Sequence, residues 1–291
     1  LGATSLGYAG YLKSLKYAKE RPQGRPVLGK DPASPQVPII EHPDVRRMLL
    51  AQKSYVEGAL ALSLYCAKLD DDHKSLEDEE GRKKAALLLD LLTPITKSWP
   101  SQWCLDANSQ AIQILGGYGY ARDYEVEQHY RDNRLNAIHE GTHGIQAMDL
   151  LGRKVTMEGG AALGALVGEI NSTVERGKAA GGETAAHAAT LEASLQRLLE
   201  VTGILWGNGA DGAEQALANA TAYLEATGDI VIAWLWLEQL LAAEGKDGEF
   251  YDGKRAAANY FFKIALPRTG PQLDLLASGD RTSLDLDPSV L

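Results

Sequence analysis

The sequence predicts an all-α protein. Apolar residues recur at three- and four-residue spacing along most of the chain, as on the buried face of an amphipathic helix, and no segment keeps the period-two alternation of a β-strand. Apolar side chains make up 45% of the 291 residues, enough for a sizeable core. Ala and Gly become frequent from Gly159 onward, so we expect two parts: a helical bundle over residues 1–158 and a second helical unit over residues 159–291.

The first segment is predicted to be a helix that ends near Arg21. Its inward face repeats at helical spacing: Leu6, Tyr8, Tyr11, Leu12, Leu15 and Ala18. Five prolines then rule out a regular helix: Pro22, Pro26, Pro32, Pro35 and Pro38. Residues 22–41 are therefore expected to form an ordered loop, and a long helix should begin at about Pro43.

A turn and a proline are predicted to divide the next helices. Leu69–Gly81 is acidic, with three consecutive aspartates, and we expect a solvated turn there. Pro100 should break the following helix, because proline removes a backbone hydrogen bond. Helices are predicted over about 82–98, 101–116, 124–135, 161–176, 184–203, 211–244 and 254–267, with another that starts just after Gly141 and an irregular tail after Pro267.

Composition excludes several classes of function. A net charge of −10 and a pI near 5.1 argue against a general nucleic-acid surface. Cys66 and Cys104 form neither a disulfide framework nor a zinc knuckle, which favours a cytoplasmic location. The longest apolar run, Ile230–Leu237, is far shorter than the roughly 20 residues of a membrane-spanning helix. The chain opens with Leu1 rather than Met, in what reads as a helix, so we expect a piece of a longer protein.

Glu140 is the main candidate for chemistry. It precedes a helix start with Thr142 as a possible N-cap, and Gly141 allows a sharp turn before it. Burial between Ile138 and Ile145 would disfavour the charged form of such a carboxylate, whereas the nearby helix N-terminus would favour it. A carboxylate that can be tuned in this way suits a base that removes a proton from carbon. The alternative from position alone is an acidic residue that stabilises the helix dipole.

The same letters also match a metal site. His139-Glu140-Gly141-Thr142-His143 satisfies the H-E-x-x-H pattern of zinc hydrolases. Both histidines bind one metal only if they share a continuous helix, and Gly141 in a helix interior costs about 1 kcal/mol. A third ligand is not evident, although Glu158 and Glu169 stay open. A zinc hydrolase and a non-catalytic helical interaction module are therefore the alternatives from other functional classes.

Two further strings complete a pattern. Gln113-Ile114-Leu115-Gly116-Gly117-Tyr118-Gly119-Tyr120 ends an apolar helix in glycines, and Tyr17-Ala18-Lys19-Glu20-Arg21 ends a helix on an arginine. Alone, they indicate a helix C-cap and a surface arginine. Together with the Glu140 string, and in their order along the chain, they resemble the C-terminal helical part of acyl-CoA dehydrogenases. Residues 259–269 resemble the extension of 3-methylmercaptopropionyl-CoA dehydrogenase-like members.

This resemblance implies a function. Glu140 would remove the proton alpha to the thioester of a short-chain or thioether acyl-CoA, while a hydride passes from the beta carbon to N5 of FAD; Gly141 would contact the substrate. His139 departs from the family, which usually has an aromatic residue before the base. The residues implied to bind FAD are Arg21, Gln23, Gln113, Gly116, Gly117, Thr142 and Gln146.

The resemblance also implies partners. An electron-transfer flavoprotein would accept the electrons, and a homodimer or homotetramer would share the flavin sites. An acyl-CoA oxidase, with oxygen as acceptor, is the close alternative. The family's N-terminal and middle domains are not in these residues, so we expect this piece alone to be inactive.

Overall fold

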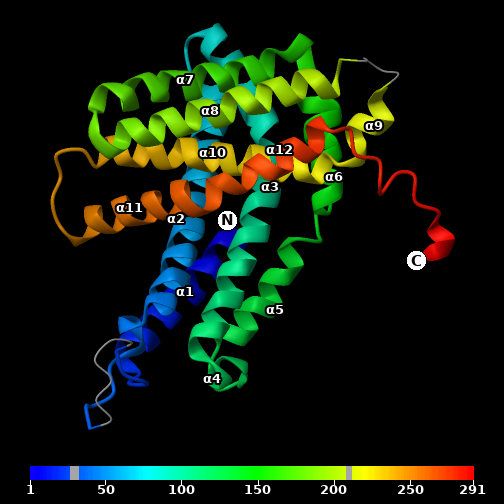
Figure 1. Cartoon of the computed structure of the whole chain (residues 1–291). Helices are drawn as coiled ribbons and strands as arrows, with labels where there is room; N and C mark the ends of the chain where they lie inside the picture. Colours follow the sequence, from blue (N-terminus) through cyan, green and yellow to red (C-terminus); the bar gives the residue numbers. More distant parts are fainter. Residues whose placement is uncertain (27–32, 208–211) are drawn as a thin grey trace. The chain divides into compact units, whose positions relative to one another are not determined.

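The computed structural model describes residues 1–26, 33–207 and 212–291, and the regular elements in these ranges are helices (Figure 1). Pairing of β type is limited there to an isolated antiparallel bridge between Pro22 and Pro38. The prediction of an all-α class is confirmed.

The chain forms two compact units, and each is made of two segments. Unit 1 contains Leu1–Leu60 and Pro100–Glu140, and unit 2 contains Ala61–Trp99 and Gly141–Leu291. Two long helices contribute residues to both units: α2 (Pro43–Ser75) and α3 (Glu79–Leu115). The predicted division cuts the chain once, between residues 158 and 159, whereas the two units are defined by contacts and each combine two segments. That division stays a prediction.

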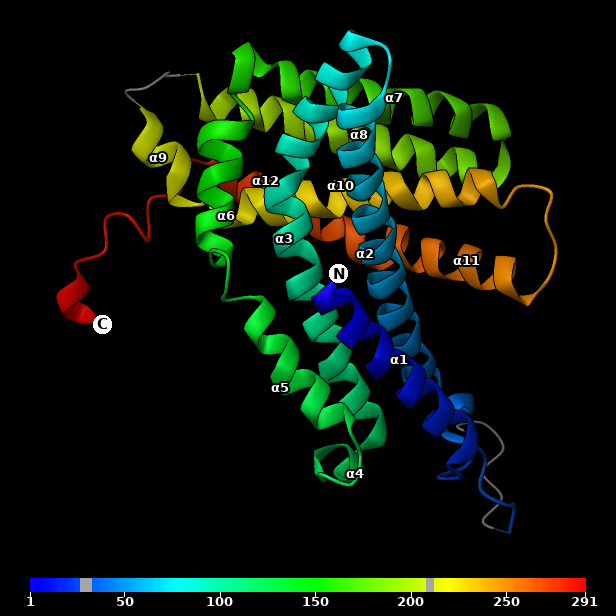
Figure 2. The same ribbon diagram turned by 180° about the vertical axis from the view of Figure 1, so that it is seen from behind.

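Unit 1 is built around α1 (Gly2–Glu20), which packs against α5 (Val126–Asn136) and the C-terminal part of α3 (Figure 2). The predicted helix end near Arg21 is confirmed. Gly7 lets α1 approach α3 closely, because a Cβ at Gly7 would lie 2.7 Å from the Cβ of Cys104. A larger residue at Gly7 would therefore push the two helices apart.

Unit 2 contains the helices from α6 onward, and α7, α8 and α10 run side by side in both views (Figures 1 and 2). The bounds of its helices are α6 (His143–Asp149), α7 (Ala161–Ala180), α8 (Gly182–Leu205), α9 (Ala213–Ala218), α10 (Ala220–Ala242), α11 (Glu249–Tyr260) and α12 (Thr269–Ala277). The chain also has π turns at Leu150–Lys154 and Phe261–Ala265, and 3-10 turns at Ile39–Glu41, Met157–Gly160, Leu266–Arg268 and Pro288–Val290.

The core of unit 2 is α10. Its residues from Ala226 to Leu237 are all buried, and its contacts include α6, α7, α8, α11 and α12. Trp234 and Trp236 are its largest buried side chains. A helix that is mostly apolar on all sides is stable in water only where other elements cover it. None of the helices in the described part of the chain is long and apolar enough to cross a bilayer.

The solvated turn predicted over Leu69–Gly81 is wrong for most of its length. The helix α2 continues to Ser75, and the break between α2 and α3 is confined to residues 76–78. Ion pairs one helical turn apart hold the acidic segment in the helix: Lys68 with Asp72, and Lys74 with Asp70 at 2.6 Å. Such pairs each stabilise a helix by a few tenths of a kcal/mol, so consecutive aspartates did not end it.

The break predicted at Pro100 is also wrong. The helix α3 runs without interruption from Glu79 to Leu115, through both Pro94 and Pro100. Each proline costs roughly 3 kcal/mol in a helix interior. Tertiary packing offsets that cost, because α3 buries many apolar side chains on both sides of the prolines: Leu88, Leu91, Leu92, Ile95, Trp99, Cys104, Ala107 and Ala111.

The tail after Pro267 is more regular than predicted. The segment Thr269–Ala277 is the helix α12, which contacts α8 and α10. Leu273 and Leu276 are both buried on its inner face, and their burial explains why the segment is ordered.

The helix predicted over 211–244 is divided. Asn219 has φ −114° and ψ 28°, outside the helical range, and it separates α9 from α10. Its side-chain amide donates to the carbonyl of Asp280 at 2.8 Å, which anchors the break. Residue 211 of this prediction lies outside the described residues, as does Pro32 of the predicted loop.

Candidate active site

The glycine string after α3 forms a tight turn followed by the short helix α4 (Gly117–Tyr120). Gly116 has φ +60°, a conformation that favours glycine. Gly119 lies against α3, because a Cβ there would be 2.5 Å from the carbonyl oxygen of Ile112. Gly116 and Gly117 are exposed, and a Cβ on either would meet no atom of this chain within 4 Å. Their backbone is therefore open to a ligand.

Arg21 lies beside this turn. Its guanidinium carbon is 5.5 Å from the centre of the Tyr118 ring on α4. Tyr118 in turn contacts Tyr17 and Tyr124, with ring centres 6.5 and 5.1 Å apart. The Nε atom of Arg21 is buried and has no hydrogen-bond partner in this chain. Two of the three sequence strings therefore meet within unit 1, and they leave a charged donor without an acceptor.

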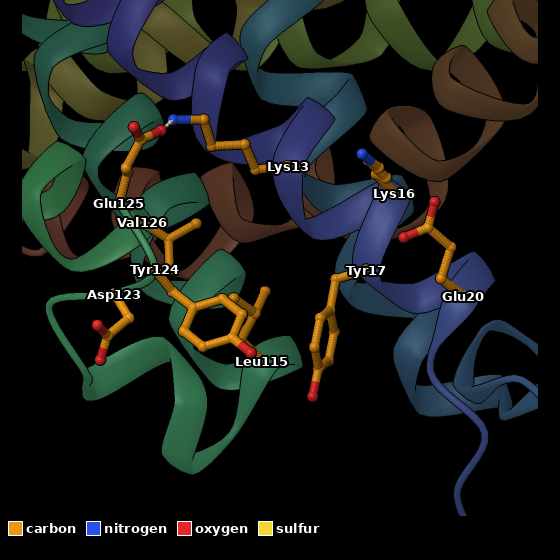
Figure 3. Close-up of a pocket in the computed structure, with 9 residues that line it drawn as sticks. All are labelled: Lys13, Lys16, Tyr17, Glu20, Leu115, Asp123, Tyr124, Glu125 and Val126. Atoms are coloured by element: carbon orange, nitrogen blue, oxygen red, sulfur yellow. Dashed lines mark hydrogen bonds and ion pairs between the residues drawn. The ribbon is translucent and has the colours of Figure 1, made fainter.

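A cavity of about 340 Å³ opens next to these tyrosines (Figure 3). Tyr17 and Lys13 line it from α1, and Tyr124 lines it from the loop before α5. Lys13 is already paired with Glu125, and its Nζ lies 2.9 Å from Nε2 of His129. Burial, together with the charge of Lys13, lowers the pKa of His129. The cavity has the volume of a small-molecule site, and it was not predicted from the sequence.

Glu140 lies on a turn after α5. It has φ +56°, and Gly141 has φ +91°. A left-handed conformation costs a residue other than glycine about 1–2 kcal/mol, and such strain is concentrated at functional sites. The side chain is 77% exposed, and Ile138 and Ile145 are exposed as well. This chain therefore does not supply the burial that we expected around Glu140.

The residues after Glu140 are held in unit 2. Lys97 on α3 donates to the carbonyl oxygen of Gly141 at 2.5 Å. Thr142 occupies the N-cap position of α6 as predicted, but its side chain makes no capping hydrogen bond. Its carbonyl accepts from the backbone N–H of Gln146 at 3.0 Å. A Cβ on Gly141 would lie 3.0 Å from Nε2 of Gln146, so Gly141 and Gln146 are close neighbours.

The other predicted residues lie apart from Glu140. Gln23 is exposed in the loop after α1, where its backbone N–H donates to the carbonyl of Val37 at 2.9 Å. Gln113 is exposed near the end of α3. The 11 residues of α5 separate the glycine turn from the Glu140 turn, which corresponds to about 16 Å at 1.5 Å per residue. One chain therefore holds the base and the Arg21 cluster at opposite ends of α5.

Two neighbours of the Glu140 turn were not predicted. Lys97 lies 44 residues from Gly141 in the sequence, and no local pattern links the two. Asn136 lies three residues before His139 and 3.1 Å from its ring. Spacing by three places Asn133, Asn136 and His139 on one side of the chain, and this signal could have identified them.

The zinc alternative requires a geometry that the structure does not have. His139 lies within the turn after α5, whereas His143 begins α6. Two successive residues with positive φ, Glu140 and Gly141, separate them. The two histidines therefore do not share a helix. No cluster of three His, Cys, Asp or Glu side chains in the described ranges could hold a metal ion.

Two family models match most of the chain. Residues 2–155 match the family model described as acyl-CoA dehydrogenase, C-terminal domain, and residues 166–287 match the model described as acetyl-CoA dehydrogenase C-terminal like. The broad-specificity linear acyl-CoA dehydrogenase FadE5 of Mycobacterium tuberculosis is 33% identical over 97% of this chain and 48% of its own length. The 3-methylmercaptopropionyl-CoA dehydrogenase of Ruegeria pomeroyi is 36% identical over 88% of this chain and 44% of its own length.

A solved structure shares the fold. The acyl-CoA dehydrogenase of Bacillus anthracis, complexed with FAD, superposes with a TM-score of 0.72 at 17% identity, over 99% of this chain and 51% of that chain. The chain thus spans about half the length of the curated relatives named above. It belongs to the acyl-CoA dehydrogenase family, whose C-terminal domain it contains.

Proposed function

We propose that this chain is the C-terminal part of an FAD-dependent acyl-CoA dehydrogenase in which Glu140 removes the alpha proton of the substrate. The observation that carries the proposal is the Glu140 turn. Glu140 is an exposed carboxylate in a strained left-handed conformation, followed by a helix start, and the resemblance in sequence implies that it is the family's base. Because this carboxylate is exposed, it would contact a substrate that is bound mainly by other parts of the full-length protein.

The residues of unit 1 support FAD as the cofactor. The buried, unpartnered Nε of Arg21 fits an anionic phosphate oxygen, because a guanidinium offers fixed charge and several donors. The open backbone at Gly116 and Gly117 fits close approach of the same group. Gln23, Gln113, Thr142 and Gln146 are proposed as further contacts. When bound, FAD supplies the acceptor for the hydride that leaves the beta carbon.

The chain's own residues would perform three tasks. The carboxylate of Glu140 takes the proton from the carbon next to the thioester, and the C–H electron pair becomes part of the new double bond. The backbone at Glu140 and Gly141 donates to the thioester carbonyl and stabilises the charge that develops on it. Lys97 holds this backbone through the carbonyl of Gly141.

We further propose that the active site is shared between subunits. Arg21 and the glycine turn lie at the far end of α5 from Glu140, so the flavin that they contact would belong to a neighbouring copy, in a homodimer or homotetramer. The 291 residues alone would then lack a complete site. The two family-model matches, which end at residue 155 and begin at residue 166, support a boundary near residues 158 and 159.

The substrate would be a short-chain or thioether acyl-CoA, and an electron-transfer flavoprotein would reoxidise the flavin. Both curated relatives named above are dehydrogenases, which favours this acceptor over oxygen. An acyl-CoA oxidase is the second candidate. The rate at which oxygen reoxidises the substrate-reduced flavin distinguishes them, because only an oxidase turns over rapidly with oxygen alone.

The test uses the full-length protein with FAD and butyryl-CoA under anaerobic conditions. Loss of flavin absorbance should be at least about 10²-fold slower in Glu140→Gln, the scale of general-base catalysis. Glu158→Gln is the matched control, because Glu158 is also an exposed glutamate with positive φ. Equal rates for Glu140→Gln and the unmodified protein would contradict the proposal and favour a non-catalytic helical module.

A further inference from the structure

A chain of hydrogen-bonded amides runs through unit 1 toward Glu140. The side-chain NH₂ of Asn108 donates to the carbonyl of Leu6 at 2.9 Å. The NH₂ of Asn133 donates to the Oδ1 of Asn108 at 2.7 Å. The NH₂ of Asn136 then donates to the Oδ1 of Asn133 at 3.0 Å. Asn108 and Asn133 are fully buried, so the chain of amides is sealed from water at its inner end.

The direction of this chain is fixed at its inner end. The carbonyls of Leu6 and Ala3 can only accept, and they receive the NH₂ groups of Asn108 and Asn133 respectively. Asn108 must therefore present its oxygen to Asn133, and Asn133 must present its oxygen to Asn136. A reversed amide anywhere in the chain would place two donors or two acceptors face to face.

The outer end of the chain sets the tautomer of His139. The oxygen of Asn136 lies 3.1 Å from Nε2 of His139. Since that oxygen can only accept, Nε2 must carry a hydrogen, and Nδ1 of the neutral ring carries a lone pair. This Nδ1 lies 3.6 Å from Oε2 of Glu140. Nδ1 of His139 and Oε2 of Glu140 are then both acceptors, and a proton on the carboxyl group would form a hydrogen bond between them.

We propose that His139 is a positioning residue for Glu140, with Nδ1 held ready to accept a hydrogen bond from the carboxyl group once it has taken the substrate proton. This inference rests on the proposed function. In the step, the substrate C–H bond breaks and an O–H bond forms on Glu140. The new O–H donates to Nδ1 of His139, which stabilises the protonated base. The ring is 43% exposed, so it does not serve mainly to fill the core.

The first test compares variants of the full-length holoenzyme in steady-state turnover. His139→Phe keeps a ring and removes both nitrogens. It should lower kcat about 10-fold with KM within about twofold, the effect of losing one hydrogen bond to a group that changes charge. The isotope effect with alpha-deuterated substrate should rise, because proton removal becomes slower. His73→Phe is the control, since His73 forms a similar pair with Asp70 at 3.4 Å on α2.

A second pair of variants tests the tautomer. Asn136→Leu removes the acceptor that holds hydrogen on Nε2 and should lower kcat in the same direction as His139→Phe. Asn136→Asp keeps the acceptor for Nε2 of His139 but loses the donor to Oδ1 of Asn133, so it should restore only part of kcat. Equal kcat values for the two Asn136 variants would overturn the role of the amide chain.

A double variant separates this inference from the proposed function. Because His139 acts through Glu140, His139→Phe should have no further effect in a Glu140→Gln background. A loss of activity in Glu140→Gln but an unchanged kcat in His139→Phe would overturn the inference and leave the proposed function intact. An unchanged rate in Glu140→Gln would overturn both.

Discussion

Two carboxylates show how this chain treats the same chemical group in opposite ways. Asp229 lies in the middle of α10 and is 1% exposed; it accepts from the indole N–H of Trp99 at 2.8 Å and lies 3.5 Å from the guanidinium of Arg268. Glu140 lies on a turn, is largely exposed and has a left-handed backbone. Packing fixes the first carboxylate, whereas backbone torsion fixes the second. Asp229 is therefore part of the packed core of unit 2, whereas the Glu140 side chain lies at the surface.

The largest effect expected on stability concerns Asp229. Burial raises its pKa to about 6, although Arg268 and Trp99 oppose that shift. Between about pH 4 and pH 6 the folded state holds a proton that the unfolded chain has released, so this group's contribution to stability falls as pH rises through that window. Asp229→Asn should remove this loss, which is on the order of 3 kcal/mol.

Urea unfolding at several pH values measures the effect. The free energy of unfolding of Asp229→Asn, relative to the unmodified protein, should increase from pH 4 to pH 7. Glu225, which faces the same region and bonds to Gln272, is kept unchanged in both proteins. A difference that does not vary with pH would show that Asp229 does not titrate in this window.

A smaller effect should follow from crowding the same place. A Cβ on Gly228 would lie 2.6 Å from Cδ1 of Trp99, whose ring is held by its bond to Asp229. Gly228→Ala should therefore destabilise the protein by about 2 kcal/mol, as overpacked cores do. Gly168→Ala on α7 is the control, because nothing lies within 4 Å of its added carbon and the change should be neutral or stabilising. Similar unfolding free energies for the two variants would contradict the conclusion that tight packing of Gly228 against Trp99 fixes the surroundings of Asp229.

The smallest expected change in stability concerns the left-handed backbone of Glu140. Glu140→Gly should stabilise the protein by about 1 kcal/mol, because glycine adopts positive φ without the steric cost of a side chain. The same variant should lose the activity proposed above. Glu158→Gly, at φ +50°, should gain similar stability and keep its rate. Thermal unfolding and turnover together check this, and a destabilised Glu140→Gly would show that the side chain is held by contacts instead of torsion.

The sequence predicted the helices better than it predicted which residues contact one another in the fold. Helical periodicity was sufficient for the all-α class and for the end of α1 near Arg21, since local spacing determines both. Local rules failed at Pro100, where burial of residues such as Trp99 and Cys104 offsets the cost of proline. They failed again at Asp70, which an ion pair with Lys74 keeps in the helix.

The candidate site was predicted only in part, for the same reason. The sequence predicted that Arg21 follows the end of a helix and that Glu140 precedes the start of one, and the structure has both in these places. The contact between Arg21 and Tyr118 joins residues far apart in sequence, so only the tertiary fold could show it. The exposure of Glu140 likewise depends on what packs around it, and apolar neighbours in sequence did not indicate it.

The uninterrupted helix α3 has a consequence for how this architecture can be altered. Its first half belongs to unit 2, where Lys154 pairs with Asp90 at 2.6 Å and Asp229 accepts from Trp99. Deleting residues 159–291 would remove Asp229, which accepts from the indole N–H of Trp99, and would expose the Trp99 ring to water. An exchange of residues 159–291 between relatives would therefore also require changes on the surface of α3 that faces them, because α3 lies outside the exchanged segment.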